Sequence, residues 1–168
     1  MTWRKNLSEF DNLMSRLSQS KPSKSKNQMP RAVLNREAGL WKLLSDGLRK
    51  TKRKIETTRL ESWATPGVPD VLLCSENGQF SFLELKVVKR RASKVDLSPH
   101  QCAWLSRHAH SNSFIIVREP SLAISVFPAS YAVDLRLDKF SDSRPIQVFE
   151  GPYNWEKFFS LICPLDGV

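Results

Sequence analysis

The sequence predicts an α/β protein in which a β-sheet is flanked by helices. Apolar residues recur at helical spacing in several segments, and runs rich in β-branched and aromatic residues lie between them. In the central part of the chain the order is a helix, three strands, a second helix and a further strand. At 168 residues the chain fits one compact domain that buries about two thirds of its unfolded surface.

The first segment, residues 1–18, is expected to be an amphipathic N-terminal helix. Its apolar stripe, at helical spacing, consists of Leu7, Phe10, Leu13, Met14 and Leu17. Residues 19–30 are rich in Ser, Lys and Pro and nearly free of apolar side chains, which is typical of a flexible basic linker. The helix therefore packs on its own domain or meets a partner subunit, and residues 31–168 form the main domain with a C-terminal extension.

The main domain is expected to open with a helix and a strand. Residues 35–48 form the helix, with Glu37 near its start and Gly47 weakening its end. Its apolar side is made of Leu40, Trp41, Leu43, Leu44 and Leu48. Residues 54–62 favour a strand of uncertain register. Trp63 either belongs to the core or stacks on a splayed base.

A β-hairpin is predicted next, because two apolar runs, residues 67–74 and 80–88, flank a turn built on Asn77-Gly78. Side chains alternate along a strand, so Glu84 and Lys86 share one face of the second run while its leucines occupy the other. A strand that is apolar on both faces is expected to be central in the sheet.

The C-terminal half adds two helices and two strands. Residues 98–109 are predicted to be a helix, with Pro99 at a favourable position in its first turn. The remaining segments are, in order, strands at 113–117 and 123–127, an irregular stretch at 128–151, and a helix at 154–162 with Asn154 as its cap.

Three ionisable residues interrupt the apolar runs of the hairpin, namely Asp70, Glu84 and Lys86. Ionisable side chains are rare in such runs unless they have a function. Asp70 on the first strand would approach Glu84 on the second, and two close carboxylates repel unless a cation or a proton intervenes. Mg²⁺ prefers oxygen ligands and keeps several waters, so two carboxylates and a substrate phosphate suit it, with Lys86 reaching the phosphate or the attacking water. The alternative is a surface hairpin with a solvated Glu84–Lys86 pair, which leaves the flanking apolar residues unexplained.

Pro69-Asp70, thirteen intervening residues and Glu84-Leu85-Lys86 resemble the motif of the PD-(D/E)XK nuclease superfamily. With Gly67, Glu37 and the helix start Ser98-Pro99-His100-Gln101, the stretch from about Arg31 to Glu119 resembles virus-type replication-repair nuclease domains and archaeal-type Holliday-junction resolvases. The resemblance implies a restriction-endonuclease-like core, with a mixed central sheet flanked by helices and the motif residues gathered at one edge of the sheet.

The resemblance also implies a role for each motif residue. Asp70 and Glu84 would bind the metal, often joined by the backbone carbonyl of Leu85, and Lys86 would assist the nucleophilic water. Glu37 would be an additional metal ligand and Gln101 a positioning residue, although a glutamine near a helix start also serves as a cap partner. Mg²⁺ is the expected cofactor, with Mn²⁺ able to substitute.

The net charge favours a polyanionic partner, because 26 Lys and Arg against 17 Asp and Glu give +9. Basic residues cluster on both sides of the motif. The side chains expected to contact DNA phosphates are Lys52, Arg53, Lys54, Lys89, Arg90, Arg91 and Lys94. Free basic side chains on solvated loops are the alternative interpretation.

Other kinds of site find no support in the sequence. The three cysteines, Cys74, Cys102 and Cys163, are too few and too widely spaced for a zinc site or a disulfide framework. A glycine-rich phosphate loop is missing, so no nucleotide cofactor is expected. No apolar run of ~18 residues and no signal-peptide pattern occurs, so a soluble intracellular protein with no membrane partner is expected.

The expected function is therefore a Mg²⁺-dependent endonuclease that hydrolyses phosphodiester bonds in DNA. The resemblance suggests selectivity for branched DNA such as Holliday junctions, as in recombination and repair, and cutting of two opposed strands implies a homodimer. Two alternatives remain open: a sequence-specific restriction or homing-type endonuclease, and a catalytically silent DNA-binding module.

Overall fold

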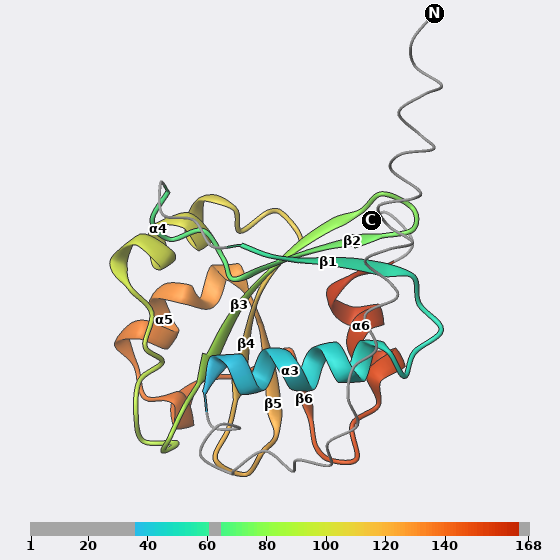
Figure 1. Cartoon of the computed structure of the whole chain (residues 1–168). Helices are drawn as coiled ribbons and strands as arrows, with labels where there is room; N and C mark the ends of the chain where they lie inside the picture. Colours follow the sequence, from blue (N-terminus) through green and yellow to red (C-terminus); the bar gives the residue numbers. More distant parts are fainter. Residues whose placement is uncertain (1–35, 61–64, 165–168) are drawn as a thin grey trace, which may run out of the picture.

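The computed structural model describes residues 36–60 and 65–164 (Figure 1). The predicted N-terminal helix and basic linker, together with Trp63, lie outside these residues, so the predictions about them stay untested.

The described residues form a six-stranded mixed sheet in which spatial order follows sequence order. Its strands are β1 (Ile55–Arg59), β2 (Val71–Ser75), β3 (Phe80–Val87), β4 (Ser113–Arg118), β5 (Ile124–Pro128) and β6 (Gln147–Phe149). β3 and β4 run parallel, whereas every other neighbouring pair is antiparallel. A parallel pair needs a crossover connection, and the helix between β3 and β4 provides it. The predicted α/β class with a mixed central sheet is confirmed.

Helices cover both faces of the sheet (Figure 1). They are α3 (Glu37–Leu48), α4 (Pro99–Arg107), α5 (Ala132–Leu137) and α6 (Trp155–Ile162). α3 and α6 pack on the face that carries Leu85 and Ile116, while α4 and α5 pack on the face that carries Ile115 and Val117. Since consecutive residues of β4 supply both cores, the continuous apolar run Phe114–Val117 reflects a strand buried on both sides.

The predicted hairpin is confirmed, with a difference at its first strand. β2 and β3 pair antiparallel, and Gly78 in their turn has φ of 80°. β3 lies between β2 and β4, as expected of a strand that is apolar on both faces. β2 begins only at Val71, so Asp70 immediately precedes the strand instead of lying within it. The preceding loop includes Gly67 at φ of 91°, a conformation that a strand does not adopt.

The expectation that residues 128–151 are irregular is wrong. This stretch contains α5 and β6 as well as two 3-10 turns. A six-residue helix and a three-residue strand are too short to show a clear period in the sequence. They are held by tertiary contacts, since Leu135 and Phe140 are buried in the core beside α4 and Phe149 is buried in the core beside α6.

The C-terminal helix is confirmed, and it explains why α3 contains a glycine. The side chain of Asn154 caps α6 by accepting a hydrogen bond from the Lys157 backbone at 3.0 Å. A Cβ atom at Gly47 would overlap with the indole ring of Trp155. Gly47 therefore allows α3 and α6 to approach closely, in addition to lying in the last turn of α3.

We expect Gly47→Ala to lower the free energy of unfolding by about 1 kcal/mol. Alanine gains about 1 kcal/mol in helix propensity, but overpacking a filled core typically costs about 1–3 kcal/mol. Chemical denaturation would measure the change, and the same substitution in a Trp155→Leu background provides the control. If Gly47→Ala stabilises the protein in both backgrounds, the glycine is not a packing requirement.

Candidate active site

Asp70 is held beside β3 by a hydrogen bond to the main chain. Its Oδ2 accepts from the backbone N–H of Leu85 at 2.8 Å, and its own carbonyl accepts from the N–H of Leu60. The β2–β3 register pairs Val71 with Leu83, which brings the preceding Asp70 next to Glu84. The hairpin thus places two carboxylates on adjacent segments, as the sequence predicted.

Glu84 is a fully buried carboxylate on the central strand β3. Its Oε1 lies 3.1 Å from Nζ of Lys86 and also accepts from the side-chain amide of Gln101. Its Oε2 is buried and has no hydrogen-bond partner among the described residues. Burial, followed by repulsion from Asp70, raises the pKa of Glu84 to about 8. This carboxylate therefore requires an additional positive charge, or a proton, at its second oxygen.

Lys86 connects β3 with the start of α3. Its buried ammonium group lies 3.1 Å from Glu84 Oε1 and 3.3 Å from Oε1 of Glu37, the first residue of α3. Burial lowers the pKa of Lys86, but attraction to Glu84 and Glu37 outweighs it, so the pKa is raised above its ordinary value of 10.5. Lys86 is accordingly protonated at neutral pH.

Gln101 acts both as a helix cap and as a partner of Glu84. In a capping box at the start of α4, the Ser98 side chain accepts from the Gln101 N–H at 3.1 Å, and Gln101 Oε1 accepts from the Ser98 N–H at 2.9 Å. This leaves the Nε2 group of the same amide to donate to Glu84. The sequence offered cap partner and positioning residue as alternatives. The structure shows the cap together with a contact to Glu84, and the positioning role stays a prediction.

Gly67 links the loop before Asp70 with the first turn of α4. A Cβ atom at this position would overlap with the backbone of His100, and the φ of 91° is already unfavourable for other residues. The sequence indicated only that a glycine precedes Pro69-Asp70. The close approach to α4 depends on the crossover between β3 and β4 and was not evident from local sequence.

The side chains of the site supply only some of the oxygen ligands that Mg²⁺ requires. Within residues 36–60 and 65–164 there is no group of three or more His, Cys, Asp or Glu side chains arranged to hold a metal. Asp70 and Glu84 provide two carboxylates, and the unpartnered Oε2 of Glu84 is suited to a hard cation that retains several waters. Glu37 contacts Lys86, and its predicted role as a ligand stays a prediction, as does that of the Leu85 carbonyl.

The predicted DNA-contacting residues fall into two groups in the structure. Arg53 donates to Ser160 Oγ and to the Cys163 carbonyl, both at 2.7 Å, and thereby fastens α6 to the segment before β1. Arg91 pairs with the buried carboxylate of Glu119. The other side chains are exposed, namely Lys52, Lys54, Lys89, Arg90 and Lys94. Contact with DNA stays a prediction for all seven.

The chain was compared with protein families, curated proteins and solved structures. No protein-family model matches the chain, and no curated protein matches it in sequence. Among solved structures, the chain is similar to Archaeoglobus fulgidus Hjc, described as a Holliday junction resolvase from an archaeal hyperthermophile. The two are 18% identical with a TM-score of 0.39, and the match covers 55% of this chain and 74% of that chain. The chemistry of the site therefore has to follow from its own residues.

Two further sequence-based expectations concern cysteines and membranes. The cysteines are free thiols: Cys102 and Cys163 are buried and Cys74 is half-buried. Among the helices of the described residues, none combines the length and apolar character that crossing a membrane requires.

We expect Gly67→Ala to destabilise the protein by about 1–3 kcal/mol, because it adds an overlap with α4 to the strain of a positive φ. Gly78→Ala is a matched control, since Gly78 also has a positive φ but no atom within 4 Å of the added Cβ. Thermal unfolding of both variants measures the difference. Equal losses of stability would show that the approach of Gly67 to α4 has no energetic importance.

Proposed function

We propose that the chain is a Mg²⁺-dependent endonuclease that hydrolyses phosphodiester bonds in DNA. The observation that carries the proposal is the environment of Glu84: a fully buried carboxylate, adjacent to Asp70, with one oxygen bound to Lys86 and Gln101 and the other unpartnered in the described residues. Placing such a group on a central strand costs stability, and a cluster of this kind is more typical of a functional site than of a structural ion pair.

Asp70 and Glu84 would hold the cation, with waters and a substrate phosphate completing its coordination. When bound, Mg²⁺ supplies Lewis-acid polarisation of the scissile phosphate and lowers the pKa of water. The Leu85 N–H fixes the orientation of Asp70, and the Gln101 amide fixes that of Glu84. These contacts keep both carboxylates in place before substrate arrives, so little reorganisation is needed.

Lys86 would stabilise the negative charge that develops on the phosphate and orient the attacking water. Its raised pKa makes it a poor proton acceptor, so a role as general base does not fit. Glu37 holds the ammonium group from the side of α3. We assign Glu37 primarily to positioning Lys86, and a contact with the cation would be an additional role.

Branched DNA is the substrate that we propose, and its basis is the motif resemblance in the sequence. The net charge of +9 favours a polyanion without selecting a DNA structure. Cutting two opposed strands of a junction needs two such sites, so we propose a homodimer as the active form. The same fold also supports sequence-specific cutting of duplex DNA, and a preference for one linear site would select that alternative.

A catalytically silent DNA-binding module is the second candidate, and one observation favours it. Lys86 already bridges Glu84 and Glu37, and the described residues contain no three-ligand metal cluster. Lys86 therefore compensates part of the negative charge of the cluster, which reduces its need for a cation. The two candidates differ in whether the protein cuts DNA when Mg²⁺ is present.

The test compares wild type with Asp70→Asn and Glu84→Gln on labelled four-way junction, flap, single-stranded and linear duplex DNA, with Mg²⁺ or EDTA. Wild type should cut branched DNA only with Mg²⁺, and each substitution should reduce the rate at least about 10²- to 10³-fold while retaining DNA binding. Lys86→Ala should lower the rate to a similar extent and weaken Mg²⁺ binding less. Glu76→Gln in the exposed hairpin turn is the control.

Full activity of Asp70→Asn or Glu84→Gln would contradict the assigned site. If the protein binds all four DNA structures, seen as retarded bands in a gel, but cuts none of them with Mg²⁺ present, the chain would instead be assigned as a DNA-binding module.

We expect Gln101→Glu to separate the two roles of Gln101. Glutamate is also favourable at this position of a capping box, so thermal stability should change little. Its carboxylate repels Glu84 where the amide donated to it, so the cutting rate or Mg²⁺ affinity should fall about 10- to 100-fold. Gln101→Ala is the comparison, because it removes the cap as well. A Gln101→Glu variant that is stable and fully active would reduce Gln101 to a cap.

A further inference from the structure

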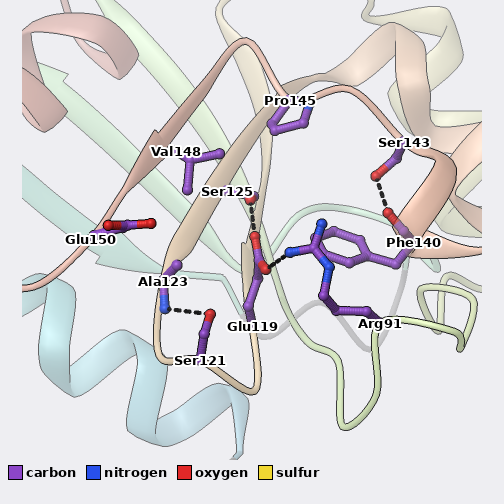
Figure 2. Close-up of a pocket in the computed structure, with 10 residues that line it drawn as sticks. All are labelled: Arg91, Glu119, Ser121, Ala123, Ser125, Phe140, Ser143, Pro145, Val148 and Glu150. Atoms are coloured by element: carbon purple, nitrogen blue, oxygen red, sulfur yellow. Dashed lines mark hydrogen bonds and ion pairs between the residues drawn. The ribbon is translucent and has the colours of Figure 1, made fainter.

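A cavity with a mixed polar and apolar lining opens at the β5–β6 edge of the sheet, outside the residues assigned to the active site (Figure 2). Its volume is about 460 Å³, within the range of ~300–1,000 Å³ typical of sites for small molecules. Its walls come from the loop after β3, the β4–β5 turn, β5, and the segment that leads from α5 into β6. These segments meet only in the folded chain.

The strand register relates this cavity to Lys86. Lys86 pairs with Val117, Val117 with Ser125, and Ser125 with Val148, so the four residues form one row across β3 to β6. Residues paired in this way point to the same face of the sheet. With about 4.8 Å between neighbouring strands, the backbones of Lys86 and Ser125 lie about 10 Å apart. Ser125 and Val148 line the cavity, which is therefore close to the proposed site of cleavage.

The floor of the cavity carries a prearranged carboxylate. Glu119 is only 4% exposed, and its Oε1 accepts a hydrogen bond of 2.6 Å from the buried hydroxyl of Ser125. Its other oxygen binds the guanidinium group of Arg91 (Figure 2). A carboxylate has about four lone-pair sites, so two remain to accept hydrogen bonds from a ligand.

The charge of the lining argues against a phosphate inside the cavity. Glu119 and the exposed Glu150 contribute two carboxylates, whereas Arg91 is the one basic residue among those that line it. The lining also contains apolar side chains, those of Ala123, Phe140, Pro145 and Val148. Apolar walls combined with fixed acceptors are suited to a flat ring that carries N–H donors on its edge.

Arg91 extends from the buried carboxylate of Glu119 to the solvent-exposed mouth of the cavity. Its guanidinium carbon lies 5.6 Å from the centre of the Phe140 ring, and its side chain is more than half exposed. A guanidinium group has five N–H donors, so pairing with Glu119 leaves donors for a DNA phosphate at the mouth of the cavity. A nucleotide bound here would have its base inside and its phosphate outside, near Arg91.

We propose that this cavity binds an unpaired nucleobase with an exocyclic amino group, belonging to a nucleotide near the scissile phosphate. The inference rests on the proposed nuclease function and deepens it. The separation of about 10 Å corresponds to about three nucleotide rises of 3.4 Å along one strand. Bases at a branch point are less costly to unstack and unpair than bases within a duplex, so capture of one base would contribute to selectivity for branched DNA.

The first step of the test locates the captured base. Four-way junctions and flaps carry 2-aminopurine, which has an exocyclic amino group, at successive positions around the branch. They are bound to the full chain carrying Asp70→Asn, which prevents cutting, in the presence of Mg²⁺. One position, within about three nucleotides of the wild-type cut, should show a several-fold rise in fluorescence as the base leaves the stack.

The second step asks whether the cavity is responsible. At the position found, cytosine, thymine or an abasic nucleotide is introduced, and DNA affinity is compared for the Asp70→Asn chain and for the same chain with Val148→Trp or Ile146→Trp. Both added substitutions lie at exposed positions next to or within the edge strand β6, but only Val148 lines the cavity. The parent chain and Ile146→Trp should bind cytosine about 10-fold more tightly than an abasic nucleotide, with thymine intermediate. Val148→Trp, which fills the cavity, should reduce this preference to less than twofold.

The outcomes separate the cavity from the nuclease function. Mg²⁺-dependent cutting by wild type with no fluorescent position, or with equal preferences in Val148→Trp and Ile146→Trp, overturns the base site and leaves the nuclease proposal in place. A fluorescent position that requires the open cavity, in a wild type that never cuts, supports the base site and overturns the nuclease. A chain that binds none of these DNAs overturns both.

Discussion

The buried carboxylate of Glu84 on the central strand is the constraint on which the arrangement of the site depends. A buried charge is unfavourable unless other groups compensate for it, and two groups contribute to this compensation. Lys86 provides a positive charge from the same strand face and Gln101 provides a hydrogen bond from the start of α4, whereas Asp70, in the segment before β2, opposes the charge by repulsion. The second oxygen of Glu84 has no partner among the described residues, so local contacts do not fully satisfy the carboxylate.

The same contacts connect Glu84 with the helices and the loop that surround it. Lys86 reaches Glu37 at the first turn of α3, and Gln101 closes the capping box of α4. Gly67 lets the loop before Asp70 lie against that same turn of α4. Two helix starts and the hairpin therefore converge on one carboxylate. A structural role would explain why the cluster is buried, but it would not explain why Oε2 of Glu84 is left unpaired among the described residues. The unpaired oxygen therefore favours a functional role for the cluster over a structural one.

Two of the basic residues predicted to contact DNA are held in place by the protein itself. Arg53 is held by α6, and Arg91 by a carboxylate on the floor of the cavity between β5 and the segment before β6. A guanidinium group fixed by the protein loses less entropy when it meets a phosphate than a free side chain does. The row from Lys86 through Ser125 to Val148 places the proposed cleavage site and the cavity on one face of the sheet. A single DNA strand is long enough to contact both.

The sequence by itself determined the α/β class, the hairpin, the position of β3 inside the sheet and the presence of Asp70, Glu84 and Lys86 together. These features follow from alternation and turn chemistry, which act over a few residues. It did not determine α5 and β6, because they are short and depend on burial of side chains such as Leu135 and Phe149. Only the tertiary structure decided that Gln101 both caps α4 and holds Glu84, that Glu37 contacts Lys86, and that Glu119 meets Arg91. Those pairs are separated by 17, 49 and 28 residues, and no local rule fixes a contact that depends on how helices and strands pack.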